Sequence, residues 1–494
     1  MTTDSAGVVQ RAGASVPKTY EGEDMYQLPK VNREYEKQFA SLYTHRLMKL
    51  RPRVLAMASA KWTNETINGE KVVRLSKILD IAHQQPCYMV GTVYCDMQFK
   101  PNVLKDVSEN MYGAPPIVEG NPLDATNRNL RQTSYSNPAT DQIALEDESG
   151  RVLLSGDIID NTVFVTGCVF GVLGLELESG VFEVVDVVYP EIAPQVPRSL
   201  DHVVPSKIAL VSGMSINSSD LDLVKLEILK EYLTGELGND ETRAASAQIS
   251  KLIIAGDSIQ VSQSLIGKDY AANSKSKYKK NHRTNYNAEA VNILDSFLCD
   301  VLQSLPVDIM PGENDPAELS LPQQPLHVAF FPKSRQFINT ESRHFRPLTN
   351  PARLEIDGLH LLGTSGQNIN DIFRYVLPNA AASTGTTPTD DDHVESRIGL
   401  IEANMYWQNI VPTAPDTLWC YPYQDEDPFT LYETPHVYFV GNMPRFETQE
   451  TVLHQKSGKE VKVRVIAVPN FSATGEIVLL DTASLACETV KIVG

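Results

Sequence analysis

The amino-acid sequence predicts an α/β protein with an additional β-barrel: a helical segment, a small barrel and a two-sheet α/β sandwich, in that order. Short strand patterns follow one another between residues 87 and 190, whereas strands alternate with helices after residue 207. A proline-bearing linker, 192–206, separates the two patterns. Because runs of strands and strand–helix alternation build different layer architectures, the change of pattern predicts two domains.

Length and composition set the limits of this interpretation. A chain of 494 residues exceeds what one hydrophobic core usually holds, and an apolar share of 42% is sufficient for globular packing. No apolar run reaches the roughly 20 residues that span a bilayer, so no membrane partner is expected. Residues 1–33 lack the basic and apolar blocks of a secretory signal, and we interpret them as a disordered tail of an intracellular protein.

The charge balance limits the possible partners. Lysine and arginine number 43 against 62 aspartates and glutamates, a formal charge of −19. A phosphate backbone repels such a chain unless its basic residues gather on one face, so we expect contact with DNA only indirectly, through a partner. The six cysteines form no C-x-x-C pair, which predicts buried thiols in a reducing compartment rather than a zinc site.

The first predicted domain, 34–191, begins with a helical pattern. Apolar residues recur at three- and four-residue spacings as far as Leu50, which predicts an amphipathic helix, interrupted or kinked by Pro52 and followed by another. We interpret its polar face as solvated, because charged runs usually cover helix surfaces. That face carries His45, Arg46, Lys49 and Arg51.

Five short strands are predicted in the rest of this domain. Interior glycines such as Gly91 and Gly171 favour the bends of a small closed barrel, and about 100 residues in five strands is the size of an OB-fold. Aromatic rings at Tyr94, Phe164 and Phe170 could stack on bases, but the neighbouring charges are mostly acidic. We therefore interpret the rings as barrel core and the OB-fold as a protein-docking module.

The second predicted domain, 207–494, combines early strand–helix alternation with a run of late strands, which predicts the two-sheet sandwich. Two stretches interrupt it. Residues 267–287 are polar and basic, and we interpret them as a disordered surface loop, with a nuclear-import signal or a DNA contact as the alternatives. Residues 379–392 are of low complexity and are predicted to be disordered.

The turn 307–316, VDIMPGENDP, resembles the metal-site loop of calcineurin-like phosphoesterases, which carries Gly-Asn-His. In that family strand-end loops bring Asp, Asn and His ligands to two metal ions about 3.5–4 Å apart, which hold a phosphoryl group. Here the Asn and His positions are occupied by Glu313 and Asn314. The resemblance thus implies a phosphoesterase fold whose ligands are replaced.

The same resemblance assigns a set of positions to the former metal site: Ser212, Met214, Asp257, Gln260, Glu313, Asn314, Asp315, Asn409, Asn442 and Pro444. Only Asp257, Glu313 and Asp315 are acids, and none of the positions is a histidine. Without a second metal ion or an imidazole acid, the chain lacks the groups that cleavage of a phosphodiester needs. We therefore predict no catalytic residue, metal or cofactor. A metal-dependent phosphoesterase or nuclease with a reduced site stays open as the alternative.

Several longer stretches resemble the small B-subunits of eukaryotic DNA polymerase delta, among them EDESGRVLLSG at 146–156 and HVYFVGN at 436–442. The resemblance runs from about residue 38 to the C-terminus. It implies a non-catalytic nuclear subunit for DNA replication and repair, in which an OB-fold is packed on an inactivated phosphoesterase-like domain. It also implies two partners, the C-terminal cysteine-rich region of the catalytic subunit and an accessory polymerase subunit.

The stretch 413–423, TAPDTLWCYPY, combines prolines with three aromatic residues, Trp419, Tyr421 and Tyr423. Its prolines exclude an ordinary helix or central strand. The aromatic residues are either a structural plug under the sheet or part of the surface that binds the catalytic subunit, because buried aromatics dominate binding hot spots. We favour the plug for Trp419.

Overall fold

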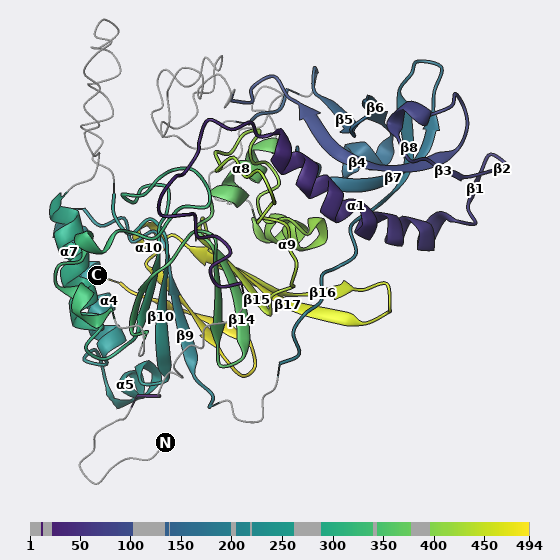
Figure 1. Cartoon of the computed structure of the whole chain (residues 1–494). Coiled ribbons are helices and arrows are strands. Elements are labelled where there is room, and N and C mark those ends of the chain that lie inside the picture. Colours follow the sequence, from purple (N-terminus) through teal and green to yellow (C-terminus); the bar gives the residue numbers. More distant parts are fainter. Residues whose placement is uncertain are drawn as a thin grey trace, which may run out of the picture.

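The computed structural model describes residues 11–12, 22–101, 134–137, 139–198, 204–217, 220–260, 288–338, 343–376 and 396–493. Figure 1 shows a small barrel beside a larger body of two sheets flanked by helices. The stretches 267–287 and 379–392 lie outside the described residues, so their predicted roles are not tested. No helix within the described ranges is long and apolar enough to cross a membrane.

The barrel contains the five predicted strands: β4 (Cys87–Asp96), β5 (Gln142–Glu146), β6 (Arg151–Ser155), β7 (Val169–Glu176) and β8 (Phe182–Val188). They run in the order β4-β5-β6-β8-β7, and β4 also pairs with β7, which closes the sheet. Phe164 and Phe170 are buried in its interior, as predicted. Shorter elements complete this part: β1 (Thr66–Ile67), β2 (Glu70–Lys71), β3 (Val73–Arg74), η1 (Ile78–Asp80) and α3 (Asp157–Asn161).

Helix α1 (Ala40–Trp62) is one continuous helix with Pro52 inside it, so the predicted interruption is wrong. A proline inside a helix removes one backbone hydrogen bond, at a cost of roughly 3 kcal/mol. Packing offsets this cost, because Leu50, Val54 and Trp62 are buried against Tyr88 and other side chains of β4, β7 and β8. The tertiary contacts of the helix therefore override its local sequence signal.

The first sheet of the larger body has the order β12-β11-β10-β9-β18-β19, and its central strands are parallel. Every residue of β10 is buried, as expected for a strand covered on both faces. The strands are β9 (Lys207–Val211), β10 (Ile249–Ala255), β11 (Val307–Met310), β12 (Phe345–Pro347), β18 (Glu476–Asp481) and β19 (Cys487–Lys491). Its outer face carries α4 (Asp220–Thr234), α5 (Asp240–Ser246) and α7 (Ala288–Val301), with η3 (Val328–Phe330) and η4 (Ser334–Phe337) beside α7.

The second sheet has the order β13-β14-β15-β17-β16. Its strands are β13 (Ala352–Ile356), β14 (Leu359–Thr364), β15 (Val437–Met443), β16 (Glu447–His454) and β17 (Glu460–Pro469). Helices α8 (Gln367–Val376) and α9 (Ile398–Trp407) lie on the side toward the barrel, and α10 (Phe471–Thr474) follows β17 (Figure 1). Apolar residues of both sheets, such as Leu210, Ile253, Phe439 and Ile466, form one core between them. The predicted two-sheet arrangement is therefore present.

The N-terminal segment contradicts its predicted disorder between residues 22 and 33. The ring of Tyr26 is only 1% exposed and stacks on Phe429, with 6.5 Å between ring centroids. The side chain of Gln324 accepts from the Leu28 N–H at 2.9 Å and donates to the Tyr26 carbonyl at 3.0 Å. Sequence patterns missed these contacts, because Gln324 and Phe429 lie about 300 and about 400 positions further along the chain.

The cysteines agree largely with their prediction. Four of the six thiols are buried and two, Cys299 and Cys487, are half-buried. All are free thiols.

Candidate functional site

The strand-end loops that carry the former ligand positions lie together at one edge of the two sheets. The Ser365 hydroxyl, after β14, donates to the carbonyl of Pro311, after β11, at 2.5 Å. The side-chain amide of Asn442, in β15, donates to the Ser365 carbonyl at 2.8 Å. The backbone N–H of Gly213, after β9, donates to the carbonyl of Gly256, after β10, at 2.9 Å. Hydrogen bonds thus connect the strand-end loops of the first sheet with those of the second sheet.

Asp257 and Asp315 are buried at this edge, and their carboxylates accept hydrogen bonds from the chain itself. Asp315 Oδ1 accepts from the backbone N–H groups of Ser258 and Ile259 at 2.9 and 3.1 Å, and its Oδ2 accepts from Gly312 at 2.8 Å. The two oxygens of Asp257 accept from the backbone and side-chain nitrogens of Asn314 at 2.9 and 3.1 Å. Both carboxylates therefore hold the turns together.

Burial also shifts the pKa values of the two acids. Burial, followed by repulsion from Asp315, raises the pKa of Asp257 above its ordinary value. Burial raises the pKa of Asp315 as well, although the N–H donors of Ser258 and Gly312 act in the opposite direction. Desolvation favours the protonated form of each acid, because a buried charge loses its hydration.

Ser212 and Asn442 occupy two further former ligand positions and bind each other. The Ser212 hydroxyl accepts from the Asn442 N–H at 2.8 Å and donates to the Pro469 carbonyl at 3.0 Å. Gly213 lies beside them with a positive φ of 61°, and a Cβ there would meet Asn470 Nδ2 at 2.2 Å. The loops are packed so closely here that only glycine fits.

The remaining predicted positions do not join this cluster. Met214 is buried in the core between the first sheet and its helices, and Gln260, Glu313 and Pro444 are exposed. Asn409 donates to Asp427 at 2.9 Å and accepts from the Val411 N–H, also at 2.9 Å. In the described part of the chain, no three or more His, Cys, Asp or Glu side chains are grouped to hold a metal ion.

Asp427 belongs to a second cluster, which sequence reasoning missed. Arg46 of α1, predicted to face solvent, is fully buried, and its Nε donates to Asp427 Oδ2 at 2.7 Å. Its other nitrogens donate to the carbonyls of Pro412 and Ala414 at 2.6 and 3.1 Å. This guanidinium joins the barrel-bound helix to the larger body. The prediction of a solvated face is therefore wrong at Arg46.

Two further cations cross the same junction. Arg53 of α1 donates to the carbonyl of Leu431 at 2.8 Å. Lys100, which follows the barrel strand β4, donates to the Cys95 carbonyl at 2.7 Å and forms an ion pair with Asp416 of the larger body. The barrel and the sandwich are thus connected by several hydrogen-bonded charges, not only by the linker.

The aromatic stretch 413–423 lies between the loop after β11 and the N-terminal segment. Trp419 is 6% exposed, and its carbonyl accepts from the Leu321 N–H at 2.9 Å. The Tyr421 ring meets Tyr35 edge to face at 5.3 Å, and it also meets Tyr423 at 5.1 Å. The rings of Tyr421 and Tyr423 therefore pack on each other and on the N-terminal segment.

Comparison with known proteins connects this architecture to one family. The model of the DNA polymerase alpha/epsilon B subunit matches residues 208–448, and that of the DNA polymerase delta subunit OB-fold domain matches residues 38–187. The second match supports the OB-fold assignment of the barrel.

Curated relatives match nearly the whole chain. The DNA polymerase delta small subunit of Saccharomyces cerevisiae is 41% identical over 96% of this chain and 93% of that protein. The DNA polymerase delta small subunit of Arabidopsis thaliana is 33% identical, covering 92% and 91%. The DNA polymerase delta subunit 2 of Drosophila melanogaster is 34% identical, covering 93% and 94%.

Proposed function

The chain belongs to the family of DNA polymerase delta small subunits, and from that premise we propose that it is a non-catalytic scaffold of the polymerase delta complex. In this role it binds the C-terminal cysteine-rich region of the catalytic subunit and bridges it to an accessory subunit. The complex works in DNA replication and repair synthesis in the nucleus. The scaffold contacts DNA only indirectly, consistent with its charge of −19.

The proposal that the chain is non-catalytic is supported by the hydrogen bonds of Asp257 and Asp315. Their carboxylates accept from N–H groups of the chain itself. Five N–H donors of the chain bind their four carboxylate oxygens. A two-metal phosphoesterase needs such oxygens directed at metal ions and a phosphoryl group. We infer an inactivated calcineurin-like phosphoesterase fold, in which the former ligand positions stabilise the strand-end loops.

The domain division 34–191 and 207–494 is part of the proposal, with the barrel as a docking module held rigidly on the sandwich. The buried pair Arg46–Asp427 supports rigidity, because its geometry requires both domains to keep one relative position. A rigid scaffold presents two binding surfaces at a constant distance. For Trp419 the near-complete burial of its ring supports the structural plug over the partner surface.

Co-purification tests the scaffold proposal. We expect the tagged chain to co-purify with its cognate full-length catalytic subunit after co-expression, and to lose it when the C-terminal cysteine-rich region of that subunit is deleted. An accessory subunit co-expressed with both should appear in the same complex only when this chain is present. A catalytic subunit retained without its cysteine-rich region would contradict the proposed contact.

A further inference from the structure

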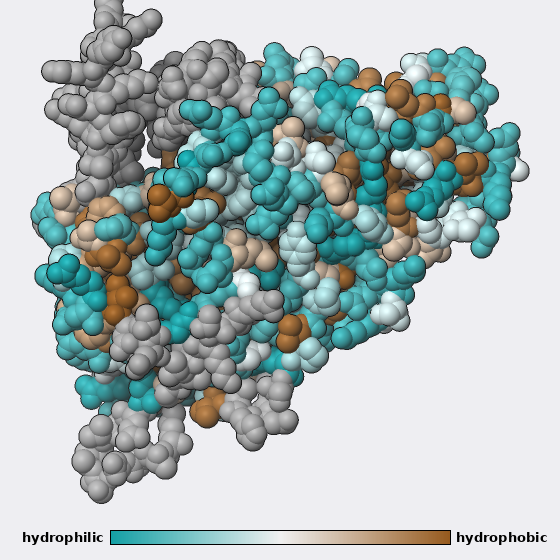
Figure 2. Space-filling model, in the orientation of Figure 1, coloured by the Kyte–Doolittle hydropathy of each residue, from teal (hydrophilic) through white to brown (hydrophobic). Residues whose placement is uncertain are grey.

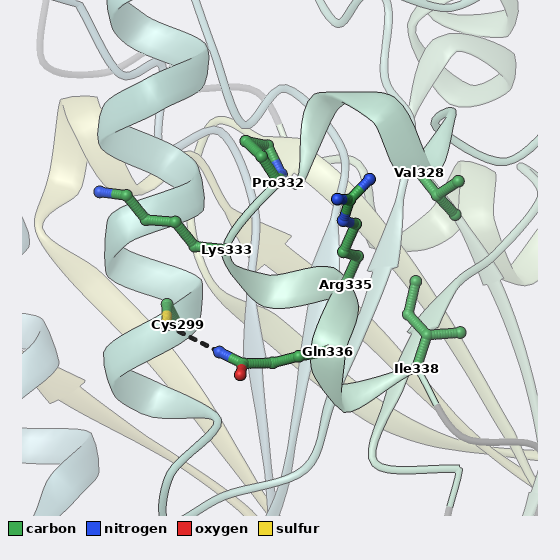
Figure 3. Close-up of a pocket in the computed structure, with 7 residues that line it drawn as sticks. All are labelled: Cys299, Val328, Pro332, Lys333, Arg335, Gln336 and Ile338. Atoms are coloured by element: carbon green, nitrogen blue, oxygen red, sulfur yellow. Dashed lines mark hydrogen bonds between the residues drawn. The ribbon is translucent and has the colours of Figure 1, made fainter.

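An open pocket lies beside helix α7, away from the strand-end loops described above. One wall carries Cys299 of the helix, and the other is formed by the segment that contains η3 and η4 (Figure 3). That segment contributes Val328, Pro332, Lys333, Arg335, Gln336 and Ile338. Val328 and Ile338 are 44% and 37% exposed, so apolar surface is accessible at the pocket. Figure 2 also has apolar surface at its left edge, over the helical layer of α4 and α7.

Hydrogen bonds hold the segment of Lys333 in place against α7. The buried carboxylate of Asp295 accepts from the backbone N–H groups of Lys333 and Ser334, both at 2.9 Å. The Ser334 hydroxyl donates to the Asp295 carbonyl at 2.9 Å. Gln336 Nε2 lies 3.8 Å from the Cys299 sulfur, which joins the two walls (Figure 3). A pocket already ordered costs little conformational entropy when it binds.

The charge of the pocket is opposite to the charge of the chain. Its lining contains two cations, Lys333 and Arg335, and no aspartate or glutamate. The Lys333 ammonium donates to the neutral Ser296 hydroxyl at 2.7 Å. Within the described ranges neither cation forms an ion pair. In a protein with a formal charge of −19, these two cations lie beside apolar surface. The nearby acids are already engaged, because buried Asp295 accepts from the backbone and Asp300 pairs with Lys230.

We propose that this pocket binds an acidic peptide segment of another protein, with an apolar side chain against Val328 and Ile338 and carboxylates beside Lys333 and Arg335. The apolar wall favours a peptide over a single-stranded nucleic acid, because its lining is aliphatic and offers no aromatic ring on which a base could stack. Two cations also provide few phosphate contacts on a chain of this net charge. The inference is independent of the proposed contact with the catalytic subunit.

Selection from a peptide library on phage tests the proposal with the full chain. The library displays random 16-residue peptides, and the double variant Lys333→Glu, Arg335→Glu removes binders of other surfaces by counter-selection. We expect the enriched peptides to combine several Asp or Glu residues with a Leu- or Phe-sized residue. A synthetic copy should bind the wild-type chain at least tenfold more tightly than the double variant by fluorescence polarisation.

Matched variants and a competitor complete the design. The control Lys456→Glu, Lys459→Glu makes the same charge change at the exposed turn between β16 and β17 and should bind like wild type. Val328→Lys retains both cations but replaces an apolar side chain of the pocket wall with a charged one. It should also weaken binding of the peptide. The proposal is overturned if the selection does not enrich acidic peptides, or if the Lys456→Glu, Lys459→Glu control loses as much peptide affinity as the double variant in the pocket. Displacement of the peptide by an equimolar dT20 oligonucleotide overturns it in favour of a phosphate site.

Discussion

Arg46 and Asp427 form a fully buried ion pair, with 2.7 Å between Nε and Oδ2, across 381 positions of the sequence. Arg46 lies on the helix that covers the barrel, and Asp427 lies in the larger body. Asp427 also accepts from Asn409 and from the Phe429 N–H at 3.0 Å. The pair therefore joins the helix that covers the barrel to the larger body at a point that solvent does not reach.

Arg46→Met should destabilise the whole chain. The substitution leaves the Asp427 carboxylate buried without its cation and leaves the carbonyls of Pro412 and Ala414 without a donor, a loss of roughly 3–5 kcal/mol. Urea unfolding followed by circular dichroism measures it. Arg74→Met, at an exposed position, is the matched control and should stay within about 0.5 kcal/mol of wild type. A loss below about 1 kcal/mol for Arg46→Met would show that the junction contributes little.

Trp419→Ala should lower the melting temperature of the isolated chain by several degrees. The substitution empties a nearly closed site, a core truncation that costs roughly 3–5 kcal/mol. Tyr421→Ala, at a half-buried ring, should cost less. Differential scanning calorimetry of both variants gives the comparison. A Trp419→Ala protein that melts like wild type but fails to bind the catalytic subunit would make Trp419 a partner contact instead of a plug.

Asp257→Asn should stabilise the protein more at pH 8 than at pH 5. Burial and Asp315 raise the pKa of Asp257 in the folded state. At a pH between the ordinary and the raised pKa, the folded protein therefore holds a proton on Asp257 that the unfolded chain has lost. The contribution of Asp257 to the free energy of unfolding of the wild-type protein therefore decreases as the pH rises from its pKa in the unfolded chain to its higher pKa in the folded protein. The amide side chain of the Asp257→Asn variant does not titrate, so it adds no pH dependence to the stability.

Urea unfolding at the two pH values measures this difference. The stability of the variant relative to wild type should increase by on the order of 1 kcal/mol between pH 5 and pH 8. Asp425→Asn, at an exposed site, is the control and should follow wild type. A variant whose stability runs parallel to wild type across this range would mean that Asp257 is ionised in the folded protein.

Tyr26→Ala should release the N-terminal segment. The buried ring stacks on Phe429, and three residues earlier Glu23 forms an ion pair with Arg346 at 2.8 Å. We expect the variant to be cleaved by trypsin several-fold faster after Lys30 and Arg33, because the local opening free energy falls with the lost contact. Tyr432→Ala, a partly exposed ring elsewhere, should leave the cleavage rate unchanged. Equal rates for wild type and Tyr26→Ala would refute an anchoring role.

The purified chain should not hydrolyse single-stranded DNA or a phosphodiester model substrate when Mn²⁺ or Mg²⁺ is supplied. The carboxylates that a reduced site would use, Asp257 and Asp315, are hydrogen-bonded to their own turns. A fluorescent oligonucleotide assay measures the rate. Any activity should persist in Asp257→Ala and Asp315→Ala proteins, which would identify a contaminant. Activity that both substitutions abolish would instead support the alternative, a metal-dependent nuclease.

Local patterns of the sequence predicted much of this fold. The five barrel strands and the strand–helix alternation after residue 207 were predictable, because a buried face makes apolar residues recur at a fixed spacing along the chain. The shorter strands β12 and β13 and the helix α9 were not predicted. The family resemblance assigned Asp257 and Asp315 to the former metal site, and in the structure Asp315 accepts from the N–H groups of Ser258 and Ile259, next to Asp257. The family resemblance also assigned Asn409 to the former metal site, but in the structure its side chain donates to Asp427 instead.

The sequence by itself determined most of the secondary structure and the family of this protein, because both depend on runs of neighbouring residues. Only the tertiary structure decided that Arg46 is buried, that Tyr26 is anchored and that Pro52 lies inside an unbroken helix. It also decided that Asp257 and Asp315 bind backbone N–H groups. These properties depend on partners that are distant in sequence, and burial or a hydrogen bond exists only once the fold brings both groups together.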